Sequence, residues 1–299
     1  MTYIQANGLR FNVHSMGHGE SIVVLIHGLV VDNLASWYFS IAPAIATRTT
    51  VFLYDLRGHG RSEQPSSGYT IHDLALDLKA LVTEAGLTDR RLILAGNSTG
   101  GLVALRFALL FPELVDSLVL IDAHVAQSHF GEQMAGTLEL EGEERTRKLR
   151  ELFGNWVDDH TANGEPDADV EATMRLFRRV SSRRRNPLVA VADGLLKDTS
   201  LIADLRDTPA TSDTELRSLQ MPVLALYGEQ SELRPEGERV AALAPHCTLE
   251  FVPGATHGLI WQATSLLGQR LGAWVDERKA TRSQAVNAPP CRTSQDARG

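Results

Sequence analysis

Cysteine, positive charge and long apolar runs are all scarce in this sequence. Its 299 residues include only two cysteines, Cys247 and Cys291, so neither a disulfide framework nor a thiolate metal site is supported. No apolar run approaches the ~18 residues that a membrane-spanning helix requires. The N-terminal residues lack the basic region followed by an apolar region that a secretory signal contains. We therefore expect a cytoplasmic protein without a membrane partner.

The charge balance argues against a further class of partner. The chain has 29 Lys and Arg residues against 37 Asp and Glu residues, which gives a formal net charge of -8. Nucleic acids and anionic surfaces attract basic proteins, so this balance has the wrong sign for either. We expect a small-molecule substrate and no nucleic acid, and the sequence leaves the oligomeric state unknown.

The chain contains a series of short apolar runs rich in β-branched residues. They are apolar on both faces, as strands buried in a parallel sheet are. The runs cover Ser21–Gly28, Thr49–Asp55, Arg91–Ser98, Ser117–Ala123, Met221–Gly228 and Cys247–Gly254. Stretches with helical periodicity, such as Tyr69–Gly86, lie between them. This alternation predicts an α/β fold with a mostly parallel central sheet and helices on both of its faces.

The alternation follows an expected hairpin and lapses once in the middle of the chain. The hairpin is predicted to turn at Asn7 and Gly8. Charged helical patterns replace the strands over residues 124–220, which we interpret as a helical cap inserted into a core of residues 1–123 and 221–276. Residues 277–299 lack apolar periodicity, so a disordered tail is predicted there.

One short motif carries the strongest chemical signal. Residues Gly96–Gly101 read GNSTGG and match G-x-S-x-G directly after a predicted strand and directly before a helical run. The glycines permit a sharp strand-to-helix turn, which presents the Ser98 hydroxyl at the start of a helix. Ser98 is therefore the candidate nucleophile.

A serine nucleophile needs a base, and a histidine is the expected one. A base must take the proton of the hydroxyl before the oxygen attacks efficiently. His257 is the best placed of the ten histidines because it follows the last apolar run. His27 and His59 lie in turns beside glycines, and we assign them to shaping the backbone.

The negative charge that forms on an attacked carbonyl oxygen needs hydrogen-bond donors, and backbone N–H groups supply them at little cost. Thr99, the residue after the nucleophile, is one candidate donor. Leu29, in the loop after the first apolar run, is the other. This chemistry requires no metal and no organic cofactor.

Four motifs occur in an order that resembles the α/β-hydrolase superfamily. They are the His27–Gly28 turn, Asp55–Ser62, Gly96–Gly101 and Gly254–Gly258. The resemblance extends from Tyr3 to about Val275 and implies a Ser-acid-His triad beneath a cap. It also places the chain apart from the haloalkane dehalogenase and epoxide hydrolase branches, because these need a carboxylate where this chain has a serine.

The acid of the implied triad is the point at which the chain departs from the family. Ser231 stands where an aspartate is usual, three residues after a Tyr-Gly pair. Asp122 is the first alternative, because it ends the strand next along the chain from Ser98 and neighbouring parallel strands lie ~4.8 Å apart. Some lactonases and lipases in the superfamily carry their acid there. Glu232 is the fallback, and Glu229 is a third candidate.

The resemblance implies a serine hydrolase that cleaves an ester, a lactone or a thioester of a small, largely apolar molecule. A second reading comes from Asn97, since the letters GNS resemble carbon-carbon bond hydrolases of vinylogous diketones. Ser231 and Gly258 depart from that branch, which usually has aspartate and often tryptophan at these places. The third reading is a non-hydrolytic ligand-binding protein or cyclase on the same scaffold.

Overall fold

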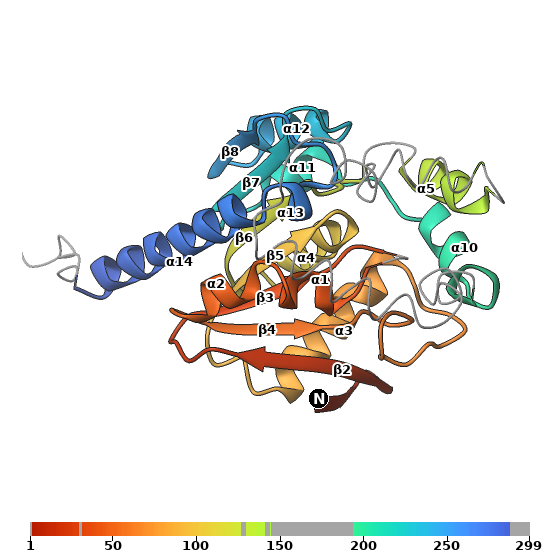
Figure 1. Cartoon of the computed structure of the whole chain (residues 1–299), viewed down its shortest axis with the longest axis horizontal. Coiled ribbons are helices and arrows are strands. Elements are labelled where there is room, and N and C mark those ends of the chain that lie inside the picture. The colour runs from red at the N-terminus through yellow and green to blue at the C-terminus, as the bar shows by residue number, and fades with distance from the viewer. Residues whose placement is uncertain (1, 30–31, 127–129, 141–143, 145–193, 288–299) are drawn as a thin grey trace, which may run out of the picture.

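The computed structural model describes residues 2–29, 32–126, 130–140, 144 and 194–287. These residues form an 8-stranded sheet with the strand order β1-β2-β4-β3-β5-β6-β7-β8 (Figure 1). Strands β3 to β8 run parallel to one another, whereas β1 and β2 pair antiparallel. The strands are β1 (Thr2–Ala6), β2 (Leu9–Met16), β3 (Ile22–Ile26), β4 (Thr50–Tyr54), β5 (Leu92–Asn97), β6 (Val115–Ile121), β7 (Val223–Gly228) and β8 (Cys247–Val252). The predicted α/β fold is confirmed.

The N-terminal hairpin turns where the sequence predicts. Asn7 and Gly8 have φ angles of 49° and 76°, and asparagine and glycine are the residues that tolerate such values best in a tight turn. Strand β2 then pairs with β4. The hairpin therefore extends one edge of the sheet, three strand positions away from the strand that carries Ser98.

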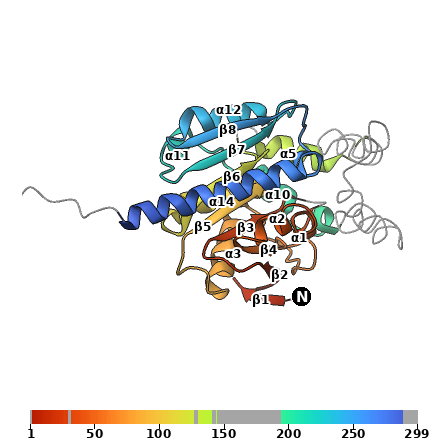
Figure 2. The same cartoon turned by 60° about the vertical axis from the view of Figure 1, so that its left-hand side comes forward.

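Helices cover both faces of the sheet, and each face has its own apolar core. Side chains along a strand alternate between faces, so Val24 of β3 joins one core, whereas Val23 and Leu25 join the other. The first core includes α3 (Ile71–Glu84), α4 (Thr99–Leu110) and α12 (Arg234–Leu243). The second includes α1 (Leu34–Tyr38), α2 (Ala42–Ala46), α13 (Leu259–Gln262) and α14 (Thr264–Asn287). Figure 2 shows α14 lying along this second face.

The regular elements that the structure describes between β6 and β7 are all helices. This segment contains α5 (Phe130–Glu139), α10 (Leu201–Arg206) and α11 (Asp213–Arg217), and no strand among its described residues. Helices α5 and α10 pack closely, since a Cβ atom added at Gly131 lies 2.3 Å from the Leu205 carbonyl oxygen. Residues 127–129, 141–143 and 145–193 lie outside the described part. The boundaries of the cap, 124–220, therefore stay a prediction.

The expected disorder from residue 277 onwards is wrong for residues 277–287. These residues continue α14, which ends at Asn287. Trp274 and Val275 anchor the helix in the core, and the Arg282 guanidinium then donates a hydrogen bond of 2.7 Å to the Ser21 hydroxyl. A polar anchor of this kind leaves no trace in apolar periodicity. Residues 288–299 lie outside the described part.

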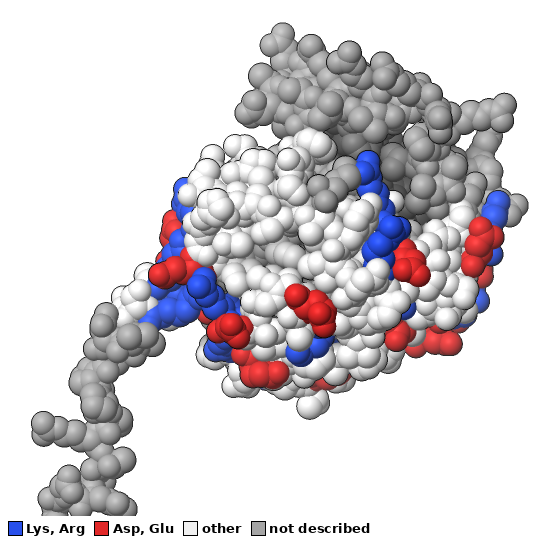
Figure 3. All heavy atoms as spheres, turned by 90° about the horizontal axis from the view of Figure 1, so that it is seen from below, with Lys and Arg blue, Asp and Glu red and all other residues white. Residues whose placement is uncertain are grey.

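Charged side chains on the surface lie in small groups of mixed sign. On the face that Figure 3 shows, basic and acidic side chains stand beside one another and neither sign dominates. Exposed ion pairs such as Arg48–Asp276 at 2.7 Å are examples of such contacts. Among the described helices, none combines the length and the apolar character that crossing a bilayer demands.

Candidate active site

Neighbouring strand ends bring the candidate residues together. Ser98 follows β5 and Asp122 follows β6, and the last residues of these two strands, Asn97 and Ile121, are paired in the sheet. The carboxyl ends of parallel strands meet at one sheet edge, where ligands of open α/β sheets bind. His257 reaches this edge from the loop between β8 and α13.

The turn at Ser98 is strained and tightly packed. Ser98 has a φ of 54° and a ψ of -126°, a region that non-glycine residues rarely adopt. A Cβ atom added at Gly96 lies 2.3 Å from the Gly100 carbonyl oxygen, and one added at Gly100 lies 2.3 Å from the Ile26 carbonyl oxygen. Only glycine fits at these two positions, so the motif is required for the sharp turn that displays the serine.

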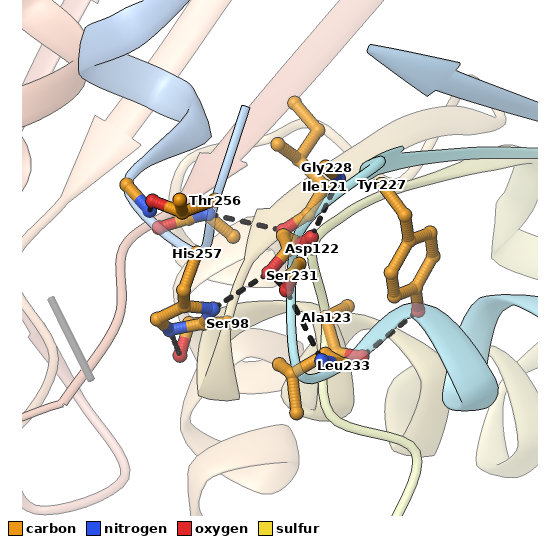
Figure 4. Close-up of polar contacts among 12 residues, drawn as sticks. Ser98, Ile121, Asp122, Ala123, Tyr227, Gly228, Ser231, Leu233, Thr256 and His257 are labelled. Carbon is orange, nitrogen blue, oxygen red and sulfur yellow. Dashed lines mark hydrogen bonds and ion pairs between the residues drawn. The ribbon is translucent and has the colours of Figure 1, made fainter. Parts of the chain in front are cut away.

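Ser98, His257 and Asp122 form a hydrogen-bonded row (Figure 4). The His257 Nε2 atom lies 3.2 Å from the Ser98 hydroxyl oxygen, and its Nδ1 atom lies 2.7 Å from Asp122 Oδ2. An ionised carboxylate only accepts hydrogen bonds, so Nδ1 carries a proton and Nε2 is left to accept from the serine. The row has the arrangement by which an imidazole takes the proton of a serine hydroxyl.

The Asp122 carboxylate is completely buried and is held by further donors. Its relative exposure is 0%, a position in which a charge is costly unless hydrogen bonds compensate it. The Gly228 backbone N–H donates to Oδ1 at 2.9 Å, and the Ser231 hydroxyl donates to Oδ2 at 2.6 Å. With His257, three donors surround the carboxylate. Figure 4 shows that Gly228 and Ser231 reach it from β7 and the loop that follows.

The two glutamates considered for the acid lie elsewhere. Glu232 is exposed to solvent, although it directly follows the buried Ser231. Glu229 is also exposed, and its carboxylate accepts a hydrogen bond of 3.1 Å from the Gly254 backbone N–H. Of the three carboxylates that the sequence suggested, the structure brings Asp122 to His257.

The two histidines assigned to backbone turns contact backbone atoms. His27 Nδ1 lies 2.6 Å from the Gly28 carbonyl oxygen, and its Nε2 accepts a 3.0 Å hydrogen bond from the Leu56 N–H. His59 Nδ1 lies 2.8 Å from the Arg57 carbonyl oxygen. Burial, and secondly repulsion from His27, lower the pKa of His59 from 6.5 to about 3. His59 is therefore neutral at ordinary pH.

The comparison with protein families decides the classification of the chain. Residues 21–264 match the family described as alpha/beta hydrolase fold. The chain belongs to the α/β-hydrolase family. The resemblance drawn from the four sequence motifs is thereby confirmed.

Individual relatives within the family differ in how much of the chain they match. A soluble epoxide hydrolase from Corynebacterium sp. (strain C12) is 36% identical over 261 residues, which cover 81% of this chain and 86% of that protein. An uncharacterized protein from Mycobacterium tuberculosis is 37% identical over 117 residues, which cover 39% of this chain and only 33% of that protein. A solved meta-cleavage product hydrolase from Pseudomonas fluorescens IP01 has a TM-score of 0.72 at 21% identity and covers 93% of this chain and 98% of its own. That last similarity shows the common fold alone.

In this α/β-hydrolase, the two candidate oxyanion donors come from two different elements. Leu29 is buried in the loop after β3, and Thr99 begins α4, where backbone N–H groups have no partner within the helix. Asp32, which the sequence reasoning missed, braces the loop of Leu29. Its carboxylate accepts from the Gly28 N–H at 2.8 Å and from the Ser36 hydroxyl. The oxyanion role of Leu29 and Thr99 stays a prediction.

A further histidine, His124, lies beside His257, and Glu236 lies beside His124; the sequence reasoning missed both. The ring centres of His124 and His257 are 6.0 Å apart. His124 Nδ1 lies 3.5 Å from a carboxylate oxygen of the buried Glu236, which also accepts a hydrogen bond from the Val125 N–H. The signal for His124 was available, since it stands two residues after Asp122 at the same strand end. Glu236 lies on α12, and the sequence held no signal that it belongs to the site.

The described residues contain no metal-binding cluster. Among them, no group of three or more His, Cys, Asp or Glu side chains is arranged to hold a metal ion.

The low pKa of His59 predicts that lowering the pH destabilises the fold. Below pH 6.5 the unfolded chain binds a proton at His59 that the folded chain binds only near pH 3, so stability falls across that window. The loss is about 1.4 kcal/mol for each pH unit below 6.5. His59→Asn removes this contribution. In urea unfolding between about pH 7 and about pH 5, we therefore expect the wild type to lose about 2 kcal/mol more than His59→Asn.

The exposed His72 supplies the matched control, since His72→Asn should follow the wild type at every pH. A difference between wild type and His59→Asn that stays constant with pH would contradict the assignment of His59 as a buried neutral histidine.

Proposed function

We propose that this α/β-hydrolase is a serine hydrolase that cleaves an ester, a lactone or a thioester of a small, largely apolar molecule. The observation that supports the proposal most is the hydrogen-bonded row of Ser98, His257 and Asp122, with separations of 3.2 Å and 2.7 Å. A serine on a strained turn, a histidine within reach of it and a buried carboxylate behind the histidine together suit acyl transfer.

The proposed first half-reaction acylates the serine. Ser98 Oγ attacks the substrate carbonyl while His257 Nε2 takes the hydroxyl proton. The Asp122 carboxylate holds the His257 ring in the required tautomer and stabilises the imidazolium that forms. The N–H groups of Leu29 and Thr99 stabilise the oxyanion. His257 then returns its proton to the leaving oxygen or sulfur, and the substrate's acyl group stays on Ser98.

The second half-reaction is the same sequence with water as the attacking group. His257 takes a proton from water, the hydroxide attacks the acyl carbon, and the proton goes back to Ser98 Oγ. In the first half the acyl-serine ester forms and the substrate's ester or thioester bond breaks, and in the second half the C–O bond of the acid product forms and the acyl-serine ester breaks. No oxidant, metal or organic cofactor is needed. His257 and Asp122 are buried, at 9% and 0% exposure, so their charges are kept out of bulk water. The attraction between the two charges is stronger in the protein interior than in water.

The similarity to a soluble epoxide hydrolase raises epoxide opening as another reaction for the same site. Opening an epoxide with the Ser98 hydroxyl would leave an ether, which has no carbonyl that water can attack. Ser98 would stay alkylated after one catalytic turnover. Acylation by an ester instead leaves a new ester that water can cleave. The serine at this turn therefore favours acyl transfer.

The proposal predicts that a fluorophosphonate probe labels the wild type at Ser98 and that a p-nitrophenyl ester of a short acyl chain is hydrolysed. Ser98→Ala should lose both, because it removes the hydroxyl that lies 3.2 Å from His257 Nε2. Intact-protein mass spectrometry and absorbance of the released phenol are the measurements. An inert Ser98 in folded protein would favour the ligand-binding or cyclase reading. Faster turnover of a vinylogous diketone from ring cleavage than of any ester would favour the carbon-carbon bond hydrolase reading.

The assignment of the acid predicts that Asp122→Asn lowers kcat by roughly 10⁴-fold. The amide introduced at position 122 can donate a hydrogen bond to His257 Nδ1, which leaves the imidazole proton on Nε2. A protonated Nε2 cannot accept the proton of Ser98. Glu232→Gln is the matched control, because it removes one carboxylate without reaching His257, and it should stay within about 2-fold of the wild type. Steady-state hydrolysis of the ester, with circular dichroism to verify folding, measures both. Normal turnover by Asp122→Asn together with a large loss in Glu232→Gln would reverse the assignment.

A further inference from the structure

We propose that Ser231 is a positioning residue for the Asp122 carboxylate. The inference rests on the proposed function, since it concerns the orientation of the acid in the same reaction.

The hydroxyl of Ser231 has a defined direction. The backbone N–H of Leu233 donates to Ser231 Oγ at 3.1 Å, so one lone pair of the hydroxyl is occupied. The hydroxyl proton then points to Asp122 Oδ2, 2.6 Å away. The side chain is only 7% exposed, and the Ser231 N–H is bonded to the Gly228 carbonyl oxygen at 3.1 Å. The donor is therefore fixed at both its backbone and its side chain.

Two donors share one carboxylate oxygen. Asp122 Oδ2 accepts from Ser231 and from His257 Nδ1, whereas Oδ1 accepts from the Gly228 N–H. One carboxylate oxygen is thus held by Gly228 at the end of β7 and the other by Ser231 in the loop after it, which stops the carboxylate from rotating when the imidazole becomes charged. Hydrogen bonds to charged groups are stronger than those between neutral groups, so the loss of the Ser231 donor should be felt in the reaction.

The first test is Ser231→Ala, compared with Ser231→Thr and with Ser117→Ala. We expect Ser231→Ala to lower kcat for the ester by about tenfold with little change in KM, because the acid is less firmly held. Ser231→Thr keeps the hydroxyl and should recover most of the loss. Ser117 is a buried serine on β6, the strand that Asp122 follows, and its hydroxyl accepts a hydrogen bond of 3.1 Å from Trp274 Nε1. Its replacement therefore controls for the loss of any buried hydroxyl.

The pH profile of kcat/KM separates positioning from a merely structural role. In Ser231→Ala, Asp122 Oδ2 no longer shares its negative charge with the Ser231 hydroxyl, so it attracts the proton-bearing His257 more strongly. This favours the imidazolium form of His257, which cannot accept the proton of Ser98. The acidic limb of the profile should therefore move to higher pH in Ser231→Ala and return in Ser231→Thr. A structural loss would lower the whole profile without moving this limb.

Wild-type kcat and pH profile in Ser231→Ala would overturn the inference, while labelling of wild-type Ser98 keeps the proposed function. If Ser231→Ala fails to fold, Ser231→Cys decides the case, because a thiol of similar size is a weaker donor and should move the acidic limb in the same direction. An unmoved limb in folded Ser231→Cys would overturn the inference as well. If wild-type Ser98 is not labelled, the proposed function fails, and the inference fails with it.

Discussion

The arrangement at the sheet edge depends on one hydrogen bond, the contact of 2.7 Å between His257 and the buried carboxylate of Asp122. A carboxylate with 0% exposure is tolerable only where donors surround it, and Gly228, Ser231 and His257 supply them. These donors come from β7, the loop after it and the loop after β8. The parallel pairing of β6 with β7 and of β7 with β8 is therefore what allows a charge at this depth.

The same edge explains how strained backbone is kept in place. Ser98 and Asp122 both have positive φ angles, 54° and 41°, although neither is glycine. Each still donates its N–H to a backbone carbonyl of the next strand, Ser98 to Ile121 at 3.1 Å and Asp122 to Leu226 at 2.8 Å. The strained residues thus continue the sheet's hydrogen bonding by one position. The sheet fixes their backbones, and their side chains are directed to His257 with little freedom to move.

The sequence predicted those features that arise from local pattern. The apolar runs located strands β3 to β8, the Asn7–Gly8 pair located the hairpin, and GNSTGG located the strained turn. What it did not predict depends on contacts between distant residues: the Ser231 hydroxyl directed at Asp122, Asp32 bracing the loop of Leu29, and Glu236 beside His124. The disordered tail was predicted to begin too early, at residue 277, because Arg282 is anchored by a polar contact rather than by an apolar stripe. The choice among three carboxylates was open in sequence because strand neighbours fix a distance but no side-chain direction.

A crystal structure of the protein with a phosphonate bound covalently to Ser98 tests the central claim most directly. The account predicts that His257 Nδ1 stays within hydrogen-bonding distance of the Asp122 carboxylate and that Gly228 and Ser231 still donate to it. The phosphoryl oxygen should face the N–H groups of Leu29 and Thr99. A His257 ring turned towards Glu232, with Asp122 left to its backbone contacts, would contradict the account.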